Sequence, residues 1–154
     1  MFELIFAAIA ATIAAPPAPR VCDDKPVLMI VNGPTRDGPR LRAYAERIAK
    51  SGIYDRLGAY YLNAPRPVAT FEGSPPANLT TLVVRFPCLA NAEAFWYSAL
   101  YQDVLRPLRL NPAAGDYVVT VYPEVPVRAG LAKAVGSNGY RRRFDGSREI
   151  RSKR

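Results

Sequence analysis

The chain has 154 residues, of which 49% are hydrophobic, enough for one compact domain with a sizeable core. It contains no histidine and two cysteines, which excludes His-based acid–base catalysis, a Ser-His-Asp triad and the usual zinc, copper and iron–sulfur sites within one chain. We expect neither a metal nor a cofactor. The formal net charge is +8, but most of it lies in residues 125–154, so the rest of the chain is nearly neutral.

Residues 1–24 are expected to be a signal peptide followed by a proline-rich segment. The apolar run from Leu4 to Ala15 has the length of a signal-peptide core and is too short to span a bilayer. Thr12 and Ala14 are small residues at the positions that a signal peptidase reads, which predicts cleavage after Ala14. We expect export, to the periplasm or by secretion. The alternative is a disordered leader on a cytoplasmic protein.

The first strand is predicted at Pro26 to Asn32, a continuous apolar run closed by Gly33. Asp37-Gly38-Pro39 is typical of a helix start, with proline at the first helical position. Apolar residues then recur at helical spacing until Ser51-Gly52 ends the helix, and residues 53–57 are expected to add another turn.

Three further strands are predicted from short apolar runs between turn signals. The second covers residues 59–63, is interrupted at Pro65-Arg66-Pro67 and resumes at residues 68–72. The third covers Thr80 to Phe86, and the final strand covers Asp116 to Tyr122.

A second helical region is predicted at Ala90 to Leu110. Within it Ser98 is expected to cap a fresh helical turn, and Pro107 is expected to bend or shorten the end. The predicted apolar face of this region consists of Ala94, Phe95, Ala99, Leu105 and Leu108.

The element order β-α-β-β-α-β predicts an α+β, ferredoxin-like domain over residues 25–124, with both helices on one face of a four-stranded antiparallel sheet. Val27 to Val31, Leu82 to Val84 and Val118-Val119 are apolar at every position, so both faces of the sheet require burial. Because two helices can cover only one face, we expect the other to pack against a second copy. The result would be a symmetric homodimer, a dimeric α+β barrel.

The two cysteines flank the predicted strands, with Cys22 before the first and Cys88 after the third. If those strands run parallel side by side, the thiols lie at opposite ends of the sheet. That places them well beyond the ~7 Å limit on the Cα separation of a disulfide. We therefore expect free thiols.

The second helical region contains the run Phe95-Trp96-Tyr97-Ser98-Ala99-Leu100-Tyr101-Gln102, followed by Leu105-Arg106-Pro107-Leu108-Arg109. Together with Phe86-Pro87, Phe71-Glu72-Gly73 and Val118-Val119, this pattern resembles the family catalogued as domain of unknown function 1330. The resemblance spans roughly Lys25 to Glu124 and implies a ferredoxin-like protomer of the dimeric α+β-barrel group. That group includes cofactor-free monooxygenases, muconolactone-type isomerases and haem-degrading enzymes, although fold analogy carries little weight for function.

Three positions depart from the pattern of that family. Asn63-Ala64-Pro65 stands where an Arg-Gly-Gly turn is common, and Arg85 stands where a glutamate often precedes the Phe-Pro pair. Ser98-Ala99-Leu100 replaces a Ser-Pro-Glu triplet. An active site built on that arginine and glutamate would be lost or inverted in this chain.

Ser98, Tyr101 and Arg109 match the family's segment and are candidates for binding a small anionic or carbonyl-bearing ligand, with Arg109 as charge partner. Each also has a purely structural interpretation, as a helix cap, a core aromatic and a helix C-terminal cation. Asn32 and Tyr60 complete the set of candidate ligand-binding residues. The aromatic residues best suited to line an apolar cavity are Tyr60, Tyr61, Trp96, Tyr97 and Tyr117.

The sequence therefore predicts a protein that binds a small, largely apolar molecule in the barrel or in the helix–sheet cleft. The first alternative is a cofactor-independent enzyme of monooxygenase or isomerase type, and the second is a purely structural dimer without ligand. An enclosed cavity that holds a polar side chain from Asn32, Tyr60, Tyr101 or Arg109 would favour chemistry, and a filled barrel would favour neither binding nor chemistry.

Residues 125–154 are expected to form a disordered basic tail. Arg141-Arg142-Arg143 could make weak contact with an anionic membrane surface. No specific binding of nucleic acid is expected, because the domain has no basic face to extend such a contact. A solvated extension is the favoured interpretation.

Overall fold

The computed structural model describes residues 21–110 and 112–128. The predicted signal peptide up to Arg20 and the basic tail beyond Arg128 lie outside the described residues. The elements are β1 (Val27–Pro34), α1 (Gly38–Ser51), α2 (Ile53–Arg56), β2 (Tyr60–Tyr61), β3 (Leu79–Phe86), α3 (Leu89–Trp96), the π-helix η1 (Leu100–Leu105), α4 (Pro107–Leu110) and β4 (Val118–Pro123).

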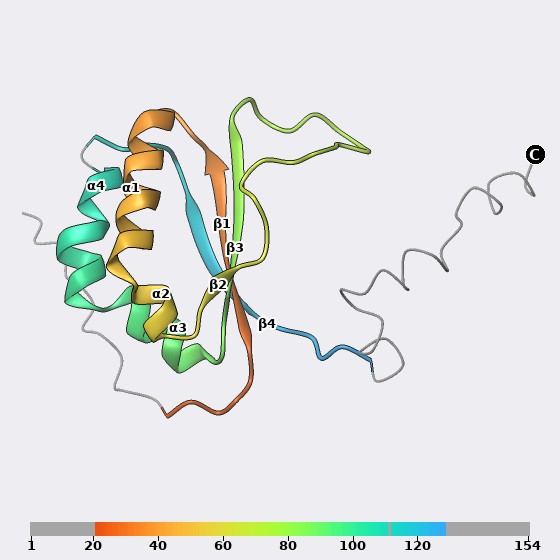
Figure 1. Ribbon diagram of the computed structural model, residues 1–154. Coiled ribbons are helices and arrows are strands. Elements are labelled where there is room, and N and C mark those ends of the chain that lie inside the picture. The colour runs from red at the N-terminus through yellow and green to blue at the C-terminus, as the bar shows by residue number, and fades with distance from the viewer. Residues whose placement is uncertain (1–20, 111, 129–154) are drawn as a thin grey trace, which may run out of the picture. The chain divides into compact units, whose positions relative to one another are not determined.

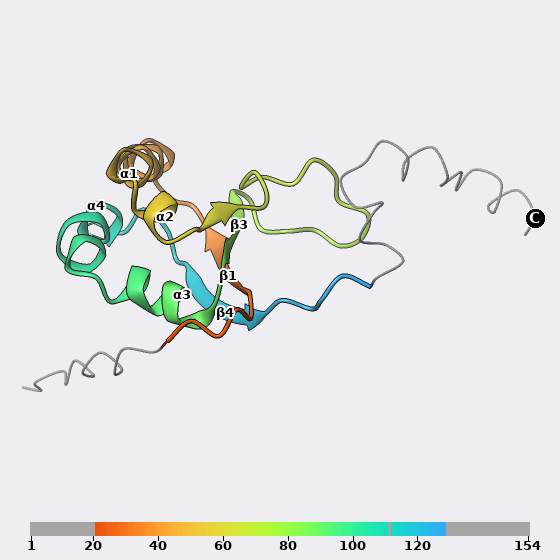
Figure 2. The same ribbon diagram turned by 60° about the horizontal axis from the view of Figure 1, so that its bottom comes forward.

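The four strands form one antiparallel sheet in the order β2-β3-β1-β4. Strand β1 is central and pairs along its length with β3 on one side and with β4 on the other. The helices lie on one face of this sheet (Figure 1, Figure 2). The domain is therefore α+β with a four-stranded antiparallel sheet, as predicted, and its topology is compatible with a ferredoxin-like fold.

Side chains of β1 alternate between the two faces of the sheet. Met29 faces the helices and is buried in the core, whereas Leu28 and Ile30 point to the opposite face and are half-buried. The register places apolar residues of the flanking strands beside them. We call this the open face, and its apolar residues are Leu28, Ile30, Tyr60, Val83, Val118 and Tyr122.

Helix α1 begins and ends where the sequence predicts. The Asp37 carboxylate accepts a hydrogen bond from the Arg40 N–H at 3.0 Å and caps the first turn. Pro39 lies in that turn. A backbone N–H at this position has no acceptor within the helix, so proline, which lacks the N–H, is tolerated there. Gly52 ends the helix with a φ of 61°, a left-handed conformation that glycine adopts without steric penalty. The additional turn predicted after it is α2.

The second helical region is divided into α3, η1 and α4. Ser98 starts the new turn as predicted, because its hydroxyl accepts a hydrogen bond from the Tyr101 N–H at 3.1 Å. The Arg106 N–H then donates to the carbonyl of Tyr101, five residues back, at 2.7 Å. In a regular helix the ring of Pro107 would clash with the carbonyl four residues before it, and a wide turn at this point avoids the clash.

The wide turn changes which residues of this region face the core. A regular helix advances ~100° per residue, so Leu108 would lie within about 20° of Tyr101 and Arg109 about 80° away. The extra residue of the π-helix puts Arg109 in the inward position instead, and Leu108 is 40% exposed. The prediction that placed Leu108 on the apolar face was wrong. Ala99, which follows the break at Ser98, is also exposed, because the break interrupts the helical period. Ala94 lies within α3 and is exposed beside the buried Phe95, so its predicted place on the apolar face was wrong as well.

Strand β2 is shorter than predicted, and residues 62–78 form an exposed loop without the strand expected at residues 68–72. The prolines of this loop lack the N–H groups that a sheet ladder needs. Beside β3 the side chain of Asn63 takes the place of a strand backbone. Its Oδ1 accepts the Val83 N–H at 2.8 Å, and its Nδ2 donates to the Thr81 carbonyl at 2.8 Å.

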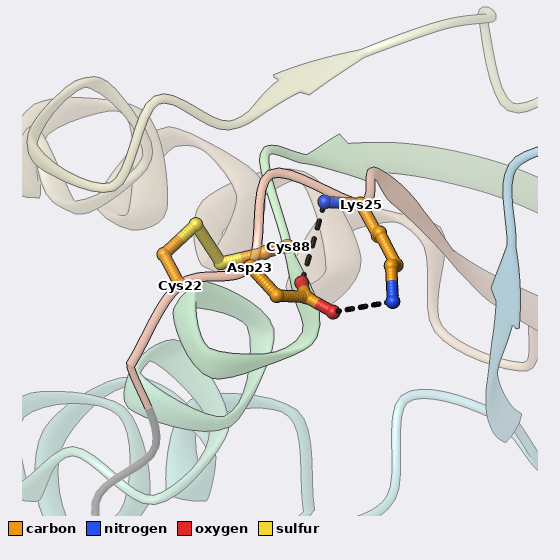
Figure 3. Close-up of polar contacts among 4 residues, drawn as sticks. All are labelled: Cys22, Asp23, Lys25 and Cys88. Carbon is orange, nitrogen blue, oxygen red and sulfur yellow. Dashed lines mark hydrogen bonds and ion pairs between the residues drawn. A yellow bond between two sulfur atoms is a disulfide. The ribbon is translucent and has the colours of Figure 1, made fainter.

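Cys22 and Cys88 form a disulfide, with their Cα atoms 5.6 Å apart (Figure 3). The prediction of free thiols was wrong because it assumed that the first and third strands run parallel. They are antiparallel, so the chain before β1 lies beside the chain after β3. Next to the bridge, the Lys25 N–H donates to the carboxylate of Asp23 at 3.3 Å, which helps to hold the approach to β1 in a turn.

The core lies between the sheet and the helices. Its largest fully buried side chains are Tyr101, Phe86, Phe95, Leu105, Val84 and Cys88.

None of the helices within residues 21–110 and 112–128 has the length and apolar character needed to cross a membrane.

Candidate functional site

A cavity of about 330 Å³ lies between the helices and the sheet. This volume is within the ~300–1,000 Å³ typical of small-molecule sites. Strand alternation directs Met29 and Val31 of β1 into it, and the spacing of Leu41, Tyr44 and Ile48 places them on the inner face of α1. Most of the lining is apolar, so the cavity suits a molecule with a hydrocarbon or aromatic body.

One wall of the cavity is aromatic. The Tyr54 ring meets the Tyr61 ring edge-on at 5.2 Å between centroids and the Phe95 ring at 5.1 Å. The Tyr101 ring lies 4.4 Å from that of Phe95 and 5.1 Å from that of Trp96. Such contacts between rings fix their orientation and add to the stability gained by burial. We call Tyr54, Tyr61, Phe95, Trp96 and Tyr101 the aromatic wall.

A buried cation lies beside this wall. Arg109 is only 9% exposed, and its Nη2 donates a hydrogen bond to the Tyr101 hydroxyl at 3.1 Å. Its guanidinium carbon lies 5.7 Å from the centre of the Tyr44 ring, in cation–π contact. The Tyr44 and Tyr101 hydroxyls are 3.5 Å apart. The wide turn of η1 is what brings Arg109 into this group.

Burial and the contacts among these groups shift their pKa values. Desolvation raises the pKa of the Tyr44 hydroxyl, the neighbouring Tyr101 adds to this rise, and Arg109 opposes it. Desolvation likewise raises the pKa of Tyr54 and of Tyr61. Burial acts to lower the pKa of the Arg109 guanidinium, but the hydrogen bonds and charge interactions with Tyr101 and Tyr44 offset it, so that the pKa is raised. Near neutral pH these three tyrosines are neutral hydrogen-bond donors, and the arginine is a cation.

No acidic side chain among the described residues that line the cavity balances that charge. Among the described residues that line it, Arg42 and Arg109 are the charged ones, and both are basic. No Asp or Glu in the described part of the chain forms an ion pair with Arg109. A guanidinium has five N–H donors in a planar fork. The site is thus able to bind an acceptor group of a ligand, above all an anionic one.

A second polar group lies where β1 ends. The Thr35 hydroxyl is 2.6 Å from the Thr80 hydroxyl and 2.9 Å from the Tyr117 hydroxyl. Thr80 and Tyr117 line the cavity, whereas Thr35 is buried behind them. These three hydroxyls form hydrogen bonds with one another.

The structure brings together two of the five predicted site residues, Tyr101 and Arg109. Ser98 accepts the Tyr101 N–H in the turn that leads into η1 and does not line the cavity. Asn32 and Tyr60 lie on the open face, where the Asn32 amide donates to the Thr81 hydroxyl at 2.9 Å. Neither contributes to this cavity.

Sequence reasoning missed Tyr44 and Tyr54 as lining residues, although it named Tyr61, Trp96 and Tyr117. Both occur on predicted helical segments, where an aromatic residue on the apolar face indicates only core packing. The helical spacing of Tyr44 predicts that its side chain is buried. It does not predict that a cavity lies beside it.

No group of three or more His, Cys, Asp or Glu side chains within the described residues could hold a metal ion.

No family model matches the chain, and no match to a curated protein was found. The resemblance to the family of domain of unknown function 1330 therefore stays a prediction.

Proposed function

We propose that this protein binds a small, largely apolar molecule in the cavity between the helices and the sheet. The observation that carries the proposal is a cavity of about 330 Å³ with an apolar lining and one buried cation, Arg109. Preformed apolar cavities with a few polar groups are typical of small-molecule sites. Tyr101 and Arg109 place in the cavity polar side chains of the kind that chemistry would need. The described lining nevertheless offers neither a carboxylate nor an imidazole as a base, which favours binding over proton abstraction.

Binding can be measured with N-phenylnaphthylamine, a neutral aromatic dye whose fluorescence rises in apolar surroundings. We expect saturable uptake by the wild-type protein with a dissociation constant in the micromolar range. The Ala45→Trp variant should weaken uptake at least ~10-fold, because Ala45 lines the cavity and an indole there would occupy it.

Ala43→Trp is the matched control for this experiment. Ala43 lies on the same helix and is also exposed, but it does not line the cavity. Its substitution should leave dye uptake unchanged. Equal uptake by the two variants would place the dye elsewhere on the protein and would contradict the proposal.

We further propose that the protein is a homodimer in which the open faces of two copies pack together as a dimeric α+β barrel. The support is the apolar composition of the open face, on which Val118 is 66%, Tyr122 51% and Tyr60 50% exposed in the single chain. Apolar patches of this kind on one face of a sheet mark interaction surfaces. A copy of the same sheet matches such a face in both shape and polarity.

The expected mass in size-exclusion chromatography with light scattering is twice that of one chain. Val118→Lys should shift the protein towards the monomer, because it would bury an uncompensated charge in the interface. Val104→Lys is the control, since Val104 is 45% exposed in η1 on the helical side. Wild-type protein that elutes as a monomer at micromolar concentration would rule out the dimer.

Export is the third part of the proposal. The Cys22–Cys88 disulfide supports it, because disulfides persist in oxidising compartments and are rare in the cytosol. Mass spectrometry of the native protein should find a mature N-terminus at or near Ala15. An intact Met1 on protein from the cytosolic fraction would contradict export.

A cofactor-independent enzyme of monooxygenase or isomerase type is the second candidate function. The buried pair of Tyr101 and Arg109 favours it, since two such donors could stabilise an oxyanion that develops on a carbonyl substrate. It predicts that a bound carbonyl compound is converted during incubation, which NMR of the mixture would detect. A purely structural dimer would remain if the cavity takes up no probe.

A further inference from the structure

We propose that the ligand of this cavity is an organic monocarboxylate, with its carboxylate on Arg109 and its apolar body against the aromatic wall. This inference rests on the function proposed above and names the chemical class of the ligand. It is based on the charge of the cavity, the geometry of its donors and its polarity.

The first argument is the missing counter-charge. A buried cation is ordinarily paired with an acidic side chain, because desolvation of a lone charge is strongly unfavourable. Arg109 is only 9% exposed, yet the polar partners of its guanidinium in the described structure are the hydroxyls of Tyr101 and Tyr44, and neither is a carboxylate. A ligand carboxylate would supply the counter-charge that the described protein residues do not.

The second argument is the arrangement of donors. The hydrogen bond to Tyr101 and the contact with the Tyr44 ring hold the guanidinium of Arg109 in place. Further N–H groups of the fork remain for a ligand, and a guanidinium binds a carboxylate through two parallel hydrogen bonds. The Tyr44 hydroxyl donates to that of Tyr101 at 3.5 Å, which holds the two phenols together beside the guanidinium.

The third argument limits the charge and size of the ligand. One deep guanidinium can neutralise one negative charge, whereas a phosphate carries ~1.5 to 2 at neutral pH and would leave charge uncompensated in an apolar cavity. The exposed Arg42 is the other cation of the lining. The remaining lining consists mainly of aromatic and aliphatic side chains, which suit an aryl or branched alkyl chain. A monocarboxylate with such a chain satisfies both conditions.

The experiment compares phenylbutyrate with its uncharged analogue phenylbutyramide, which has nearly the same shape. Each is titrated at neutral pH into wild-type protein loaded with N-phenylnaphthylamine, and loss of dye fluorescence reports displacement from the cavity. We expect the acid to displace the dye at least ~10-fold more effectively than the amide, because hydrogen bonds between charged groups are stronger than neutral ones.

Three variants test whether Arg109 causes the preference for the acid over the amide. Arg109→Met, which keeps an apolar side chain of similar length, should lose the preference for the acid, measured as the ratio of displacement by acid and by amide in the same variant. Arg109→Lys should keep part of the preference, since it retains the charge but not the fork. Arg47→Met is the matched control, because Arg47 is exposed on α1 and does not line the cavity.

Equal displacement by acid and amide in the wild-type protein would overturn the carboxylate assignment and leave the cavity function standing. A preference that persists in Arg109→Met would overturn the role of Arg109. If neither Arg109 variant folds, as judged by circular dichroism, the wild-type comparison of acid and amide still decides the ligand class. Absence of dye uptake by wild-type protein would instead count against the proposed function itself.

Discussion

Replacing Cys22 by alanine should lower the free energy of unfolding by about 2–4 kcal/mol. The bridge to Cys88 joins residues separated by 66 positions, and closing so long a loop removes much conformational freedom from the unfolded chain. The Cys22 side chain is exposed, so its truncation leaves no cavity in the core. The effect should therefore come almost entirely from loss of the cross-link. Unfolding in urea, followed by tryptophan fluorescence, measures it.

Two comparisons isolate the cross-link. Wild-type protein in reducing buffer should unfold at the same urea concentration as Cys22→Ala, because both lack the bridge. Val21→Ala changes the adjacent residue, which is 92% exposed, and should have no effect. Identical unfolding midpoints for oxidised and reduced wild-type protein would show that the bridge does not stabilise the fold.

Gly33→Ala is expected to destabilise the protein by at least ~2 kcal/mol. A Cβ at this position would overlap the carbonyl oxygen of Asp116, which belongs to the backbone and cannot move away as a flexible side chain could. The end of β1 and the approach to β4 would have to separate. Tyr117, which follows Asp116 and lines the cavity, should shift with them, so dye uptake should fall as well.

Gly38→Ala provides the control for this substitution. Gly38 lies in the first turn of α1, and nothing is within 4 Å of the position that its Cβ would take. Thermal unfolding of this variant should match the wild type or occur at a slightly higher temperature, because alanine favours the helix. A Gly33→Ala protein as stable as Gly38→Ala would mean that β1 and β4 can separate at little cost.

Local chemistry made much of the fold predictable. The start of α1 follows from Asp37 and Pro39, and its end follows from Gly52, because each residue acts through its own backbone or its nearest neighbours. The α+β class and the antiparallel sheet follow from the order of the elements. Tyr101 and Arg109 were named as candidate ligand residues from the sequence, and the structure places them side by side.

The predictions that failed needed information that is not local. Whether Cys22 can reach Cys88 depends on the direction of β3 relative to β1, which no residue near either cysteine encodes. The inward turn of Arg109 depends on the wide turn before Pro107, and a search for the 3.6-residue period assumes that this turn is regular. The same assumption placed Leu108 inside.

Asn63 and the loop that follows it have a consequence for how the protein behaves at high concentration. An exposed edge strand has unpaired backbone N–H and C=O groups that can pair with a strand of another chain and lead to fibrils. On the side of β3 that faces the loop, some of these backbone groups form hydrogen bonds with loop residues that are not in a strand. The Thr81 N–H donates to the Pro65 carbonyl at 3.1 Å, and Arg66 donates to the Leu79 carbonyl at 3.2 Å. Because these partners do not form a strand, they leave no regular template for a further strand to extend.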